Sequence, residues 1–295
     1  MLSDPRATMA SVIIDLHAHT RASDGSCTPT QVVRRARSHG VDVLAITDHD
    51  TVAGLREAIA AGESLGVRVI PGIELSVKPP QGQLHIVAYL PTANPPAMLP
   101  TLSRLQTARE QRAQVMGAKL AALGVPIDMA AVRRTAAGSI GRPHLADALV
   151  AAGHASDRAD AFARFLGDDG PAYVPHHMLD PKHALRLITD AGGLASLAHP
   201  GSLRMSLRQL ESYAARLKHI GLWGIEVYRA EHTPDQRDGF KKIARRLRLV
   251  ATGGSDFHGP GAGRHELGDT GTPLLPAEVA DLIQQALGQG VASGS

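Results

Sequence analysis

Short apolar segments alternate with amphipathic helical patterns along most of this chain, and this alternation limits its possible folds more than any other feature. The expected strands are short and apolar: 12–14, 43–46, 67–72, 84–90, 194–198, 224–227 and 249–252. Helical patterns separate several of them, at 28–40, 51–65 and 181–191. Strands that alternate with helices usually form parallel βα units. The sequence therefore predicts an α/β protein in which these units build a barrel.

One stretch interrupts the alternation. Residues 91–100 contain four prolines, which no regular element tolerates, and the sequence that follows is mostly helical over 101–123 and 144–166. The barrel is therefore expected to be discontinuous, with residues 11–98 and 174–290 forming one domain. Residues 99–173 are expected to form a helical insertion that serves as a lid over the substrate.

The composition excludes several classes of protein. The chain of 295 residues has no run of about 18 uncharged apolar residues, so we expect no membrane span. Its first ten residues lack the basic and apolar regions of a secretory signal. The single cysteine, Cys27, rules out an internal disulfide framework and favours a reducing cytoplasm. An aromatic content of 3% argues against a protein that only binds nucleic acid, and no obligatory protein partner is expected.

Histidines and carboxylates gather where the expected strands end. His17 and His19 follow the first strand and share one of its faces. Asp24 follows in the same loop, and the other strands contribute residues of the same kinds: Asp48, His49, Asp50, Glu74, His85, His199, Asp256 and His258. Because the carboxyl ends of parallel strands meet at one rim of a barrel, we expect these side chains to lie together. Burial of so many polar groups needs compensating cations, so the sequence predicts a site for several divalent metal ions.

These residues stand in motifs whose order resembles the PHP (polymerase and histidinol phosphatase) family. The motifs are His17-Ala18-His19, Thr47-Asp48-His49, Gly72-Ile73-Glu74, His85, Ala198-His199-Pro200 and Gly254-Ser255-Asp256-Phe257-His258. The resemblance covers about residues 12–98 and 181–260. It implies a distorted (βα)7 barrel and an enzyme that hydrolyses phosphate esters with bound metal ions.

The resemblance also implies which side chains hold metal. A first ion would be bound by His17, His19, Glu74 and Asp256, a second by Glu74, His85 and His199, and a third by Asp24, His49 and His258. A metal-bridging hydroxide held by Glu74, His17, His19 and Asp256 is the expected nucleophile. Some members carry histidine in place of Asp24, and the harder carboxylate favours Mn or Fe over Zn. We expect two to three divalent ions, with Mn favoured and Fe or Zn as alternatives.

A further motif, SIGRPHLADAL, places Arg142 and His144 immediately before a helix. It fits a plain helix start, and it fits a phosphate clamp, because guanidinium groups match phosphate oxygens. The Gly-Arg-Pro-His element is similar to PHP enzymes that remove the 3′-phosphate of 3′,5′-nucleoside bisphosphates, converting pAp to AMP, and that degrade short RNA from its 5′ end. Tyr228 and His232 follow the strand at 224–227 and are further candidates for substrate contact.

Several alternatives remain open at this level. Histidinol-phosphate phosphatase and cyclic nucleotide phosphodiesterase would use the same metals with a different pocket. A metal-binding accessory module is the non-enzymatic alternative, and the complete set of ligand positions argues against it. We expect a metal-dependent phosphoric monoester hydrolase acting on a small nucleotide with a 3′-phosphate, with short RNA 5′ ends as a second substrate.

Overall fold

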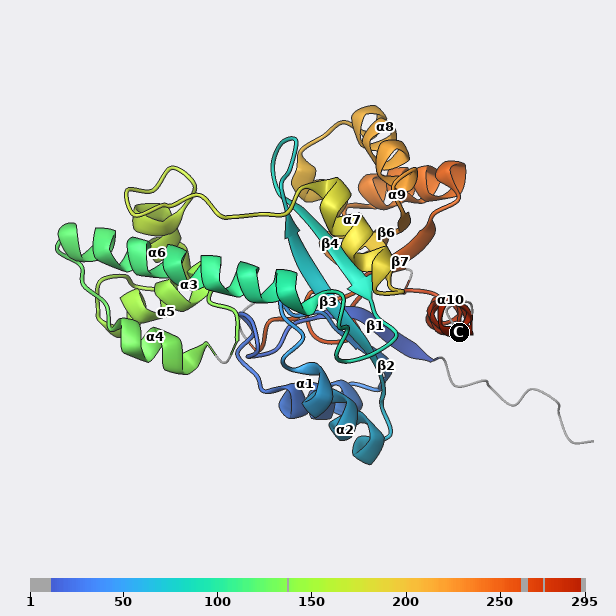
Figure 1. Ribbon diagram of the computed structural model, residues 1–295, viewed down its shortest axis with the longest axis horizontal. Helices are drawn as coiled ribbons and strands as arrows, with labels where there is room; N and C mark the ends of the chain where they lie inside the picture. The colour runs from blue at the N-terminus through green and yellow to red at the C-terminus, as the bar shows by residue number, and fades with distance from the viewer. Residues whose placement is uncertain (1–11, 137, 261–264, 273, 293–295) are drawn as a thin grey trace, which may run out of the picture.

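The computed structural model describes residues 12–136, 138–260, 265–272 and 274–292 (Figure 1). The amino-terminal segment discussed above for a secretory signal lies outside these residues. Seven strands form one curled sheet in chain order: β1 (Ile13–Ala18), β2 (Val41–Ile46), β3 (Arg68–Val77), β4 (Leu84–Tyr89), β5 (Leu194–Leu197), β6 (Leu222–Tyr228) and β7 (Val250–Gly253). The predicted α/β class and the curled, barrel-like sheet are confirmed.

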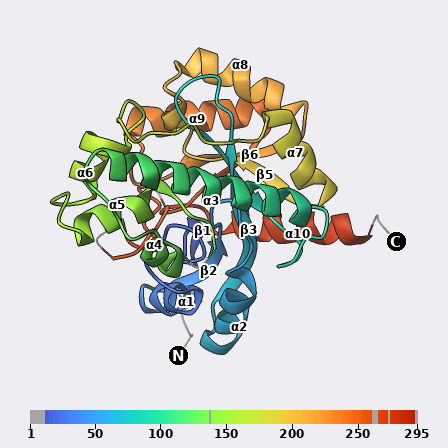
Figure 2. The same cartoon turned by 60° about the vertical axis from the view of Figure 1, so that its left-hand side comes forward.

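The helices lie mainly on the outside of this sheet (Figures 1 and 2). They are α1 (Pro29–Ser38), α2 (Leu55–Leu65), α3 (Leu99–Ala122), α4 (Met129–Thr135), α5 (Arg142–Ala151), α6 (Arg158–Ala161), α7 (Pro181–Asp190), α8 (Leu207–Lys218), α9 (Pro234–Leu247) and α10 (Glu278–Ala292), with a π-helical turn η1 (Phe162–Leu166) and a 3₁₀ turn η2 (Pro200–Leu203). Within the described ranges, none of them is long and apolar enough to cross a membrane.

Local sequence accounts for where helices begin. The hydroxyl of Thr28 caps α1 by accepting a hydrogen bond from the Gln31 backbone, and the side-chain oxygen of Gln31 accepts one from the Thr28 backbone, with Pro29 in the first turn. The predicted start of α1 is therefore right. The predicted helix at 51–65 begins later, at Leu55, because Thr51 accepts a hydrogen bond from the backbone of Ala53 and closes a turn instead. Two helices, α4 and α10, were not predicted.

The strand β4 runs against its neighbours, which corrects the prediction of a fully parallel barrel. It pairs antiparallel with both β3 and β5, whereas the remaining strand pairs are parallel. The connection 78–83 is too short for a helical crossover, so it can only reverse the chain. The beginning of β4, rather than its end, therefore lies at the rim where the other strands end.

The strand β3 is longer than the predicted segment 67–72, so Glu74 lies inside the strand rather than after it. In its second half polar Glu74 and Ser76 alternate with apolar Ile73, Leu75 and Val77, and all five side chains are buried. This alternation with a period of two is typical of a strand, and it indicates that the strand extends beyond Gly72. One face of β3 thereby joins the core, and the other presents Glu74 to the interior of the rim.

The segment after β7 joins the two ends of the sheet. The backbone of Asp256 donates to His17 at 2.8 Å, and the backbone of His19 donates to Phe257 at 2.8 Å. The buried carboxylate of Asp15 accepts hydrogen bonds from the backbone of Ser255 in the same segment at 2.9 Å. These contacts bring the motif at residues 254–258 against the motif at residues 17–19.

The helical segment between β4 and β5 has an apolar core of its own. The first half of α3 packs on the main core, and its second half extends away from the sheet with α4, α5 and α6 (Figures 1 and 2). The second core includes Met116, Leu120, Val132, Leu145, Leu149 and Leu166. We call α3 to η1 the helical lobe.

Gly254 should be essential to the closure of the sheet. A Cβ at this position would lie 2.4 Å from both the backbone nitrogen and the Cβ of His17. Gly254→Ala is therefore expected to lower the free energy of unfolding by about 1–3 kcal/mol, the usual cost of overpacking. Urea denaturation measures the change. The matched control is Gly288→Ala in α10, where a Cβ meets nothing within 4 Å and stability should be unchanged or slightly higher. Equal stability of the two variants would contradict this account.

Candidate metal centre

The nine predicted metal-binding side chains come together at one rim of the sheet. They derive from β1 (His17), the loop after it (His19, Asp24), the loop after β2 (His49), the middle of β3 (Glu74), the start of β4 (His85), the loop after β5 (His199) and the segment after β7 (Asp256, His258). His85 reaches the rim because β4 is reversed. A fully parallel strand would place it at the opposite end of the sheet.

A first group consists of His17, His19, Glu74 and Asp256. Nε2 of His17 lies 3.1 Å from Nε2 of His19, 3.3 Å from Oε2 of Glu74 and 3.2 Å from Oδ1 of Asp256. Nε2 of His19 lies 3.2 Å and 3.1 Å from the same two oxygens. Ligands about 2.0–2.1 Å from a tetrahedral metal ion stand roughly 3.3 Å apart, so these four atoms fit one divalent ion.

The orientation of His17 supports this fit. Its Nδ1 donates a hydrogen bond of 2.7 Å to Glu226, a fully buried carboxylate on β6. The second oxygen of Glu226 accepts one of 2.6 Å from the backbone of His199. Because Nδ1 donates to Glu226, Nε2 is the nitrogen of His17 that remains to bind a metal ion. Sequence analysis missed Glu226, although a carboxylate inside an apolar strand is the same signal that Glu74 gives.

A second group surrounds the other oxygen of Glu74. Oε1 lies 3.0 Å from Nδ1 of His85 and 3.0 Å from Nε2 of His199, and these two nitrogens are 3.2 Å apart. Nδ1 of His199 is 3.0 Å from the hydroxyl of Ser202, which also reaches the carbonyl oxygen of Gln83. Ser202 can therefore accept from His199 while it donates to Gln83, which again leaves Nε2 free to bind a metal ion.

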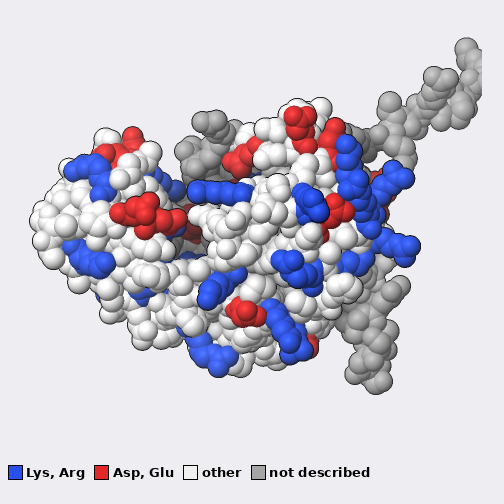
Figure 3. All heavy atoms as spheres, turned by 90° about the horizontal axis from the view of Figure 1, so that it is seen from above, with Lys and Arg blue, Asp and Glu red and all other residues white. Residues whose placement is uncertain are grey.

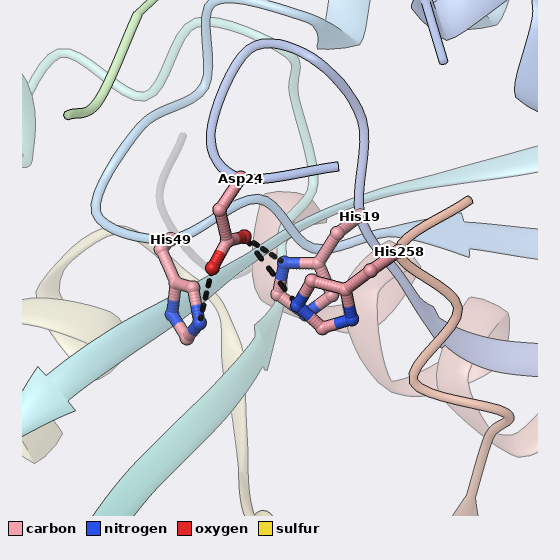
Figure 4. A group of neighbouring side chains, drawn as sticks. All are labelled: His19, Asp24, His49 and His258. Carbon is pink, nitrogen blue, oxygen red and sulfur yellow. Dashed lines mark ion pairs between the residues drawn. The ribbon is translucent and has the colours of Figure 1, made fainter. Parts of the chain in front are cut away.

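A third group contains Asp24, His49 and His258 (Figure 4). Oδ1 of Asp24 lies 3.4 Å from Nε2 of His258, and its Oδ2 lies 3.8 Å from Nε2 of His49. The ring of His258 stacks on that of His19 with centroids 4.1 Å apart. Asp48, although part of the same motif as His49, is not among these groups. It accepts hydrogen bonds from Thr20 and Ser23 and so fixes the loop that carries Asp24.

Charge balance explains how these buried groups coexist. Burial would raise the pKa of Glu74, but the imidazoles of His49, His85 and His17 hold it well below its usual value. Burial would lower the pKa of His19, but Asp256 and Glu74 raise it to about 10. Without a bound cation these carboxylates thus favour protons on His17 and His19, whose pKa values they raise. A divalent ion would replace those protons with a stronger positive charge.

The backbone is strained at three places around the rim. Asp50, His199 and Asp256 have φ angles of 53°, 24° and 55°. Such left-handed conformations are uncommon for residues other than glycine and persist where surrounding contacts enforce them. Asp50 shows such contacts, because Oδ1 accepts from the Ser76 backbone while its own backbone donates to Glu74.

Arg109 connects the helical lobe to the rim. This buried residue of α3 donates two hydrogen bonds to Asp50, of 2.8 Å and 2.6 Å, and one of 2.9 Å to the hydroxyl of Ser76. Burial would raise the pKa of Asp50, but Arg109 lowers it strongly. Asp50, which follows the candidate ligand His49, is therefore held in place by a residue of the helical lobe. Sequence analysis did not single out Arg109.

Two cavities meet at His49, Gln83 and His85. The first, of about 420 Å³, extends over β6 and α9 and is lined by Arg229, Glu231, His232 and Gln236, among others. The second, of about 280 Å³, lies between the rim and the helical lobe and is lined by Arg109, Arg112, Arg142, Phe162, Tyr173 and His176, among others. Seen from above, a hollow separates the lobe from the rest of the molecule (Figure 3).

The predicted substrate contacts have different positions. Arg142 lines the second cavity, with Asp168 as an ion-pair partner at 2.8 Å. His144 is buried, and its Nδ1 accepts from the Gly141 backbone as a cap of α5, so the plain helix start describes this residue. His232 lines the first cavity, while Tyr228 does not line either and its ring faces Lys241.

Comparison with known proteins identifies the family. A model of the PHP domain matches residues 15–170. A 3′,5′-nucleoside bisphosphate phosphatase of Chromobacterium violaceum is 37% identical over 259 residues, which are 87% of this chain and 91% of the relative. This chain belongs to the PHP family.

Two further comparisons agree with this assignment. A 5′-3′ exoribonuclease of Haemophilus influenzae is 37% identical over 254 residues, 86% of this chain and 92% of the relative. A solved structure from Bifidobacterium adolescentis, predicted to be a metal-dependent phosphoesterase, superposes with a TM-score of 0.84 at 32% identity, covering 94% of this chain and 97% of that one. The prediction that this chain is a metal-dependent phosphoesterase of the PHP family is confirmed.

Glu226 is expected to control metal affinity without binding metal. Glu226→Gln keeps the size of the side chain, but its amide cannot accept from both the His17 ring and the His199 backbone. Loss of such an orienting partner typically weakens metal binding 10- to 100-fold. Titration with Mn²⁺ against a competing chelator measures the affinity. The control is Glu231→Gln, a carboxylate 59% exposed at the same wall, which should leave affinity within twofold of the unmodified protein. Unchanged affinity in Glu226→Gln would rule out the orienting role.

Proposed function

We propose that this protein hydrolyses the 3′-phosphate of 3′,5′-nucleoside bisphosphates such as pAp, releasing the nucleoside 5′-phosphate and inorganic phosphate. The observation that carries the proposal is the junction of the metal-binding rim with an arginine-lined cavity on the helical lobe. The relative from Chromobacterium violaceum is named for this reaction, and that from Haemophilus influenzae for cleavage of RNA from its 5′ end.

In this proposal each group at the rim holds one divalent ion. The proposed ligands are His17, His19, Glu74 and Asp256 for the first ion, Glu74, His85 and His199 for the second, and Asp24, His49 and His258 for the third. Such ions, when bound, acidify a coordinated water and neutralise phosphoryl oxygens. The carboxylate of Asp24 favours Mn over Zn, and the single cysteine favours a cytoplasmic location.

The chain's own residues would select the substrate at the second cavity. The guanidinium of Arg142 lies 5.5 Å from the ring centre of Phe162 and 5.6 Å from that of Tyr173. Arg112 is nearby, and burial together with Arg142 and Arg109 lowers its pKa to about 10. Arginines that crowd each other in this way favour an anion between them. We assign this cavity to the nucleoside and its 5′-phosphate, with residues 99–173 acting as the lid.

Cleavage of short RNA is the second candidate function. The two cavities open on different sides of His49 and His85, so a substrate held in one could extend into the other. A nucleoside bisphosphate needs only one cavity and the rim. The first cavity would then accept the nucleotide that follows the cleaved bond, and short RNA with a 5′-phosphate is the matching substrate.

Glu74 should be indispensable for both activities. Glu74→Gln preserves volume but removes the charge that two sets of imidazoles share. We expect bound Mn²⁺, measured by elemental analysis after gel filtration, to fall below half of its normal content and turnover of pAp to fall at least 100-fold. A variant that keeps its metal content and rate would show that the rim is assigned wrongly.

Arg142→Ala tests the assignment of the second cavity. Charge-assisted hydrogen bonds contribute roughly 1.5–3 kcal/mol, or about a ten- to hundredfold effect on kcat/KM. We expect at least a tenfold loss on pAp with unchanged metal content. The loss on an aryl phosphate should be much smaller if Arg142 holds the 5′-phosphate, and equal if it holds the phosphate that is cleaved.

The substrate class is tested by release of phosphate from pAp and histidinol phosphate, and by opening of a 2′,3′-cyclic nucleotide, each with Mn²⁺. We expect pAp to have the highest kcat/KM. A higher value for histidinol phosphate, together with an unaffected Arg142→Ala variant, would replace the nucleotide assignment.

A further inference from the structure

A buried arginine at the end of β6 has an arrangement that the metal groups alone do not explain. Arg229 follows Tyr228 directly, its side chain is only 3% exposed, and it lines the first cavity beside Asp256 and His258. Sequence analysis gave it no role. A fully charged group in such a position needs an explanation, since removal of a guanidinium from water is costly unless it is paired.

One part of this guanidinium is already engaged. Nη2 lies 3.1 Å from Oδ2 of Asp256 and 2.7 Å from a carboxylate oxygen of Glu231. Asp256 uses its other oxygen, Oδ1, toward His17 and His19. Arg229 therefore lies one carboxylate group away from the first candidate metal position. Burial would lower the pKa of Arg229, but Asp256 and Glu226 raise it, so the side chain stays charged.

The other part of the guanidinium is not engaged. Its Nε and Nη1 are buried and make no hydrogen bond with any residue in the described ranges, and the carboxylate of Glu226 is 3.7 Å from Nη1. Buried donors in native proteins almost always have an acceptor. Asp256, Glu231 and the more distant Glu226 already balance the charge of the guanidinium, so what these two donors lack is an acceptor. Since Arg229 lines the first cavity, a ligand in that cavity can supply this acceptor.

We propose that Arg229 is a catalytic residue that binds a non-bridging oxygen of the phosphoryl group being transferred. Nη2 stays on Asp256, while Nη1 or Nε donates to the phosphoryl oxygen. In the reaction a water oxygen bonds to phosphorus, the bond from phosphorus to the ester oxygen breaks, and that oxygen keeps the electron pair and takes up a proton. Nε and Nη1 are covered in the structure, so the guanidinium must turn toward the cavity to place this donor against the negative charge of the phosphoryl oxygens.

This role differs from that proposed for Arg142, and it rests on the proposed function only in that the substrate is a phosphate ester. Arg142 faces the cavity assigned to the distal phosphate, so its loss should be selective for substrates that have one. Arg229 faces the phosphate that reacts, so its loss should weaken all phosphate esters alike. Loss of Arg142 should therefore affect some phosphate esters more than others, whereas loss of Arg229 should affect all of them equally.

The experiment compares Arg229→Met and Arg229→Ala with the control Arg246→Met, which removes an exposed guanidinium of α9 that pairs with Glu211. Metal content, the affinity of the Mn²⁺-loaded protein for inorganic phosphate by calorimetry, and kcat and KM for pAp and an aryl phosphate are measured. We expect normal metal content, at least tenfold weaker phosphate binding, and an equal loss of 100-fold or more in kcat for both substrates. Millimolar guanidinium should restore part of the activity of Arg229→Ala, and Arg246→Met should stay within threefold of normal.

Two results would overturn the proposal. Phosphate affinity and kcat within threefold of normal in a fully metallated Arg229→Met variant would show that the guanidinium does not contact the phosphoryl group. A fall in metal content that accounts for the whole loss of activity, with no rescue by guanidinium, would show that Arg229 only positions Asp256. Failure of the unmodified protein on pAp would overturn the nucleotide assignment instead, because phosphate binding and aryl phosphate hydrolysis report on Arg229 independently.

Discussion

The carboxylate of Glu74 is the interaction on which the rest of this structure depends. Oε2 lies within 3.3 Å of nitrogens from His17, His19 and His49, and Oε1 lies 3.0 Å from His85 and His199. A buried carboxylate surrounded by imidazoles is stable only if positive charge lies next to it, either as protons on the imidazoles or as metal ions. The five imidazoles come from the end of β1, the loops after β2 and β5, and the start of β4. The sheet must therefore curl far enough to bring all of them to one carboxylate.

A layer of buried and half-buried polar residues behind the rim keeps these side chains in place. Glu226 fixes the ring of His17, Ser202 that of His199, and Asp48 the loop of Asp24. Arg109 extends the same layer into the helical lobe. Most of these contacts join segments that are far apart in the chain, so the layer ties the closure of the sheet to the geometry of the rim. Changes in this layer are therefore expected to affect metal binding as well as stability.

Membership of the PHP family accounts for the chemistry of the rim, but the substrate is decided by what surrounds it. Divalent ions bind any phosphate, so discrimination requires groups that contact the remainder of the molecule. The two cavities provide such groups in different forms, with aromatic rings and arginines on the lobe side and mainly polar residues on the side of β6 and α9. The lobe has its own apolar core. Its surface can therefore vary without disturbing the strands that hold the rim.

The sequence by itself determined the α/β class, most strands, the cap of α1 and the set of side chains that meet at the rim. These features depend on local periodicity, local hydrogen bonds and residue types that bind metal, all of which can be read over a few positions. The predicted direction of β4 and the predicted length of β3 were wrong, and the helices α4 and α10 were not predicted. A short connection or a weak sequence pattern determines such features only once the neighbouring strands of the sheet are in place. Glu226 and Arg229 acquire their roles through His17 and Asp256, which are 209 and 27 positions away. Tertiary structure alone decided which atom of each side chain faces which partner, because that choice is made by hydrogen bonds and charges between residues far apart in the chain.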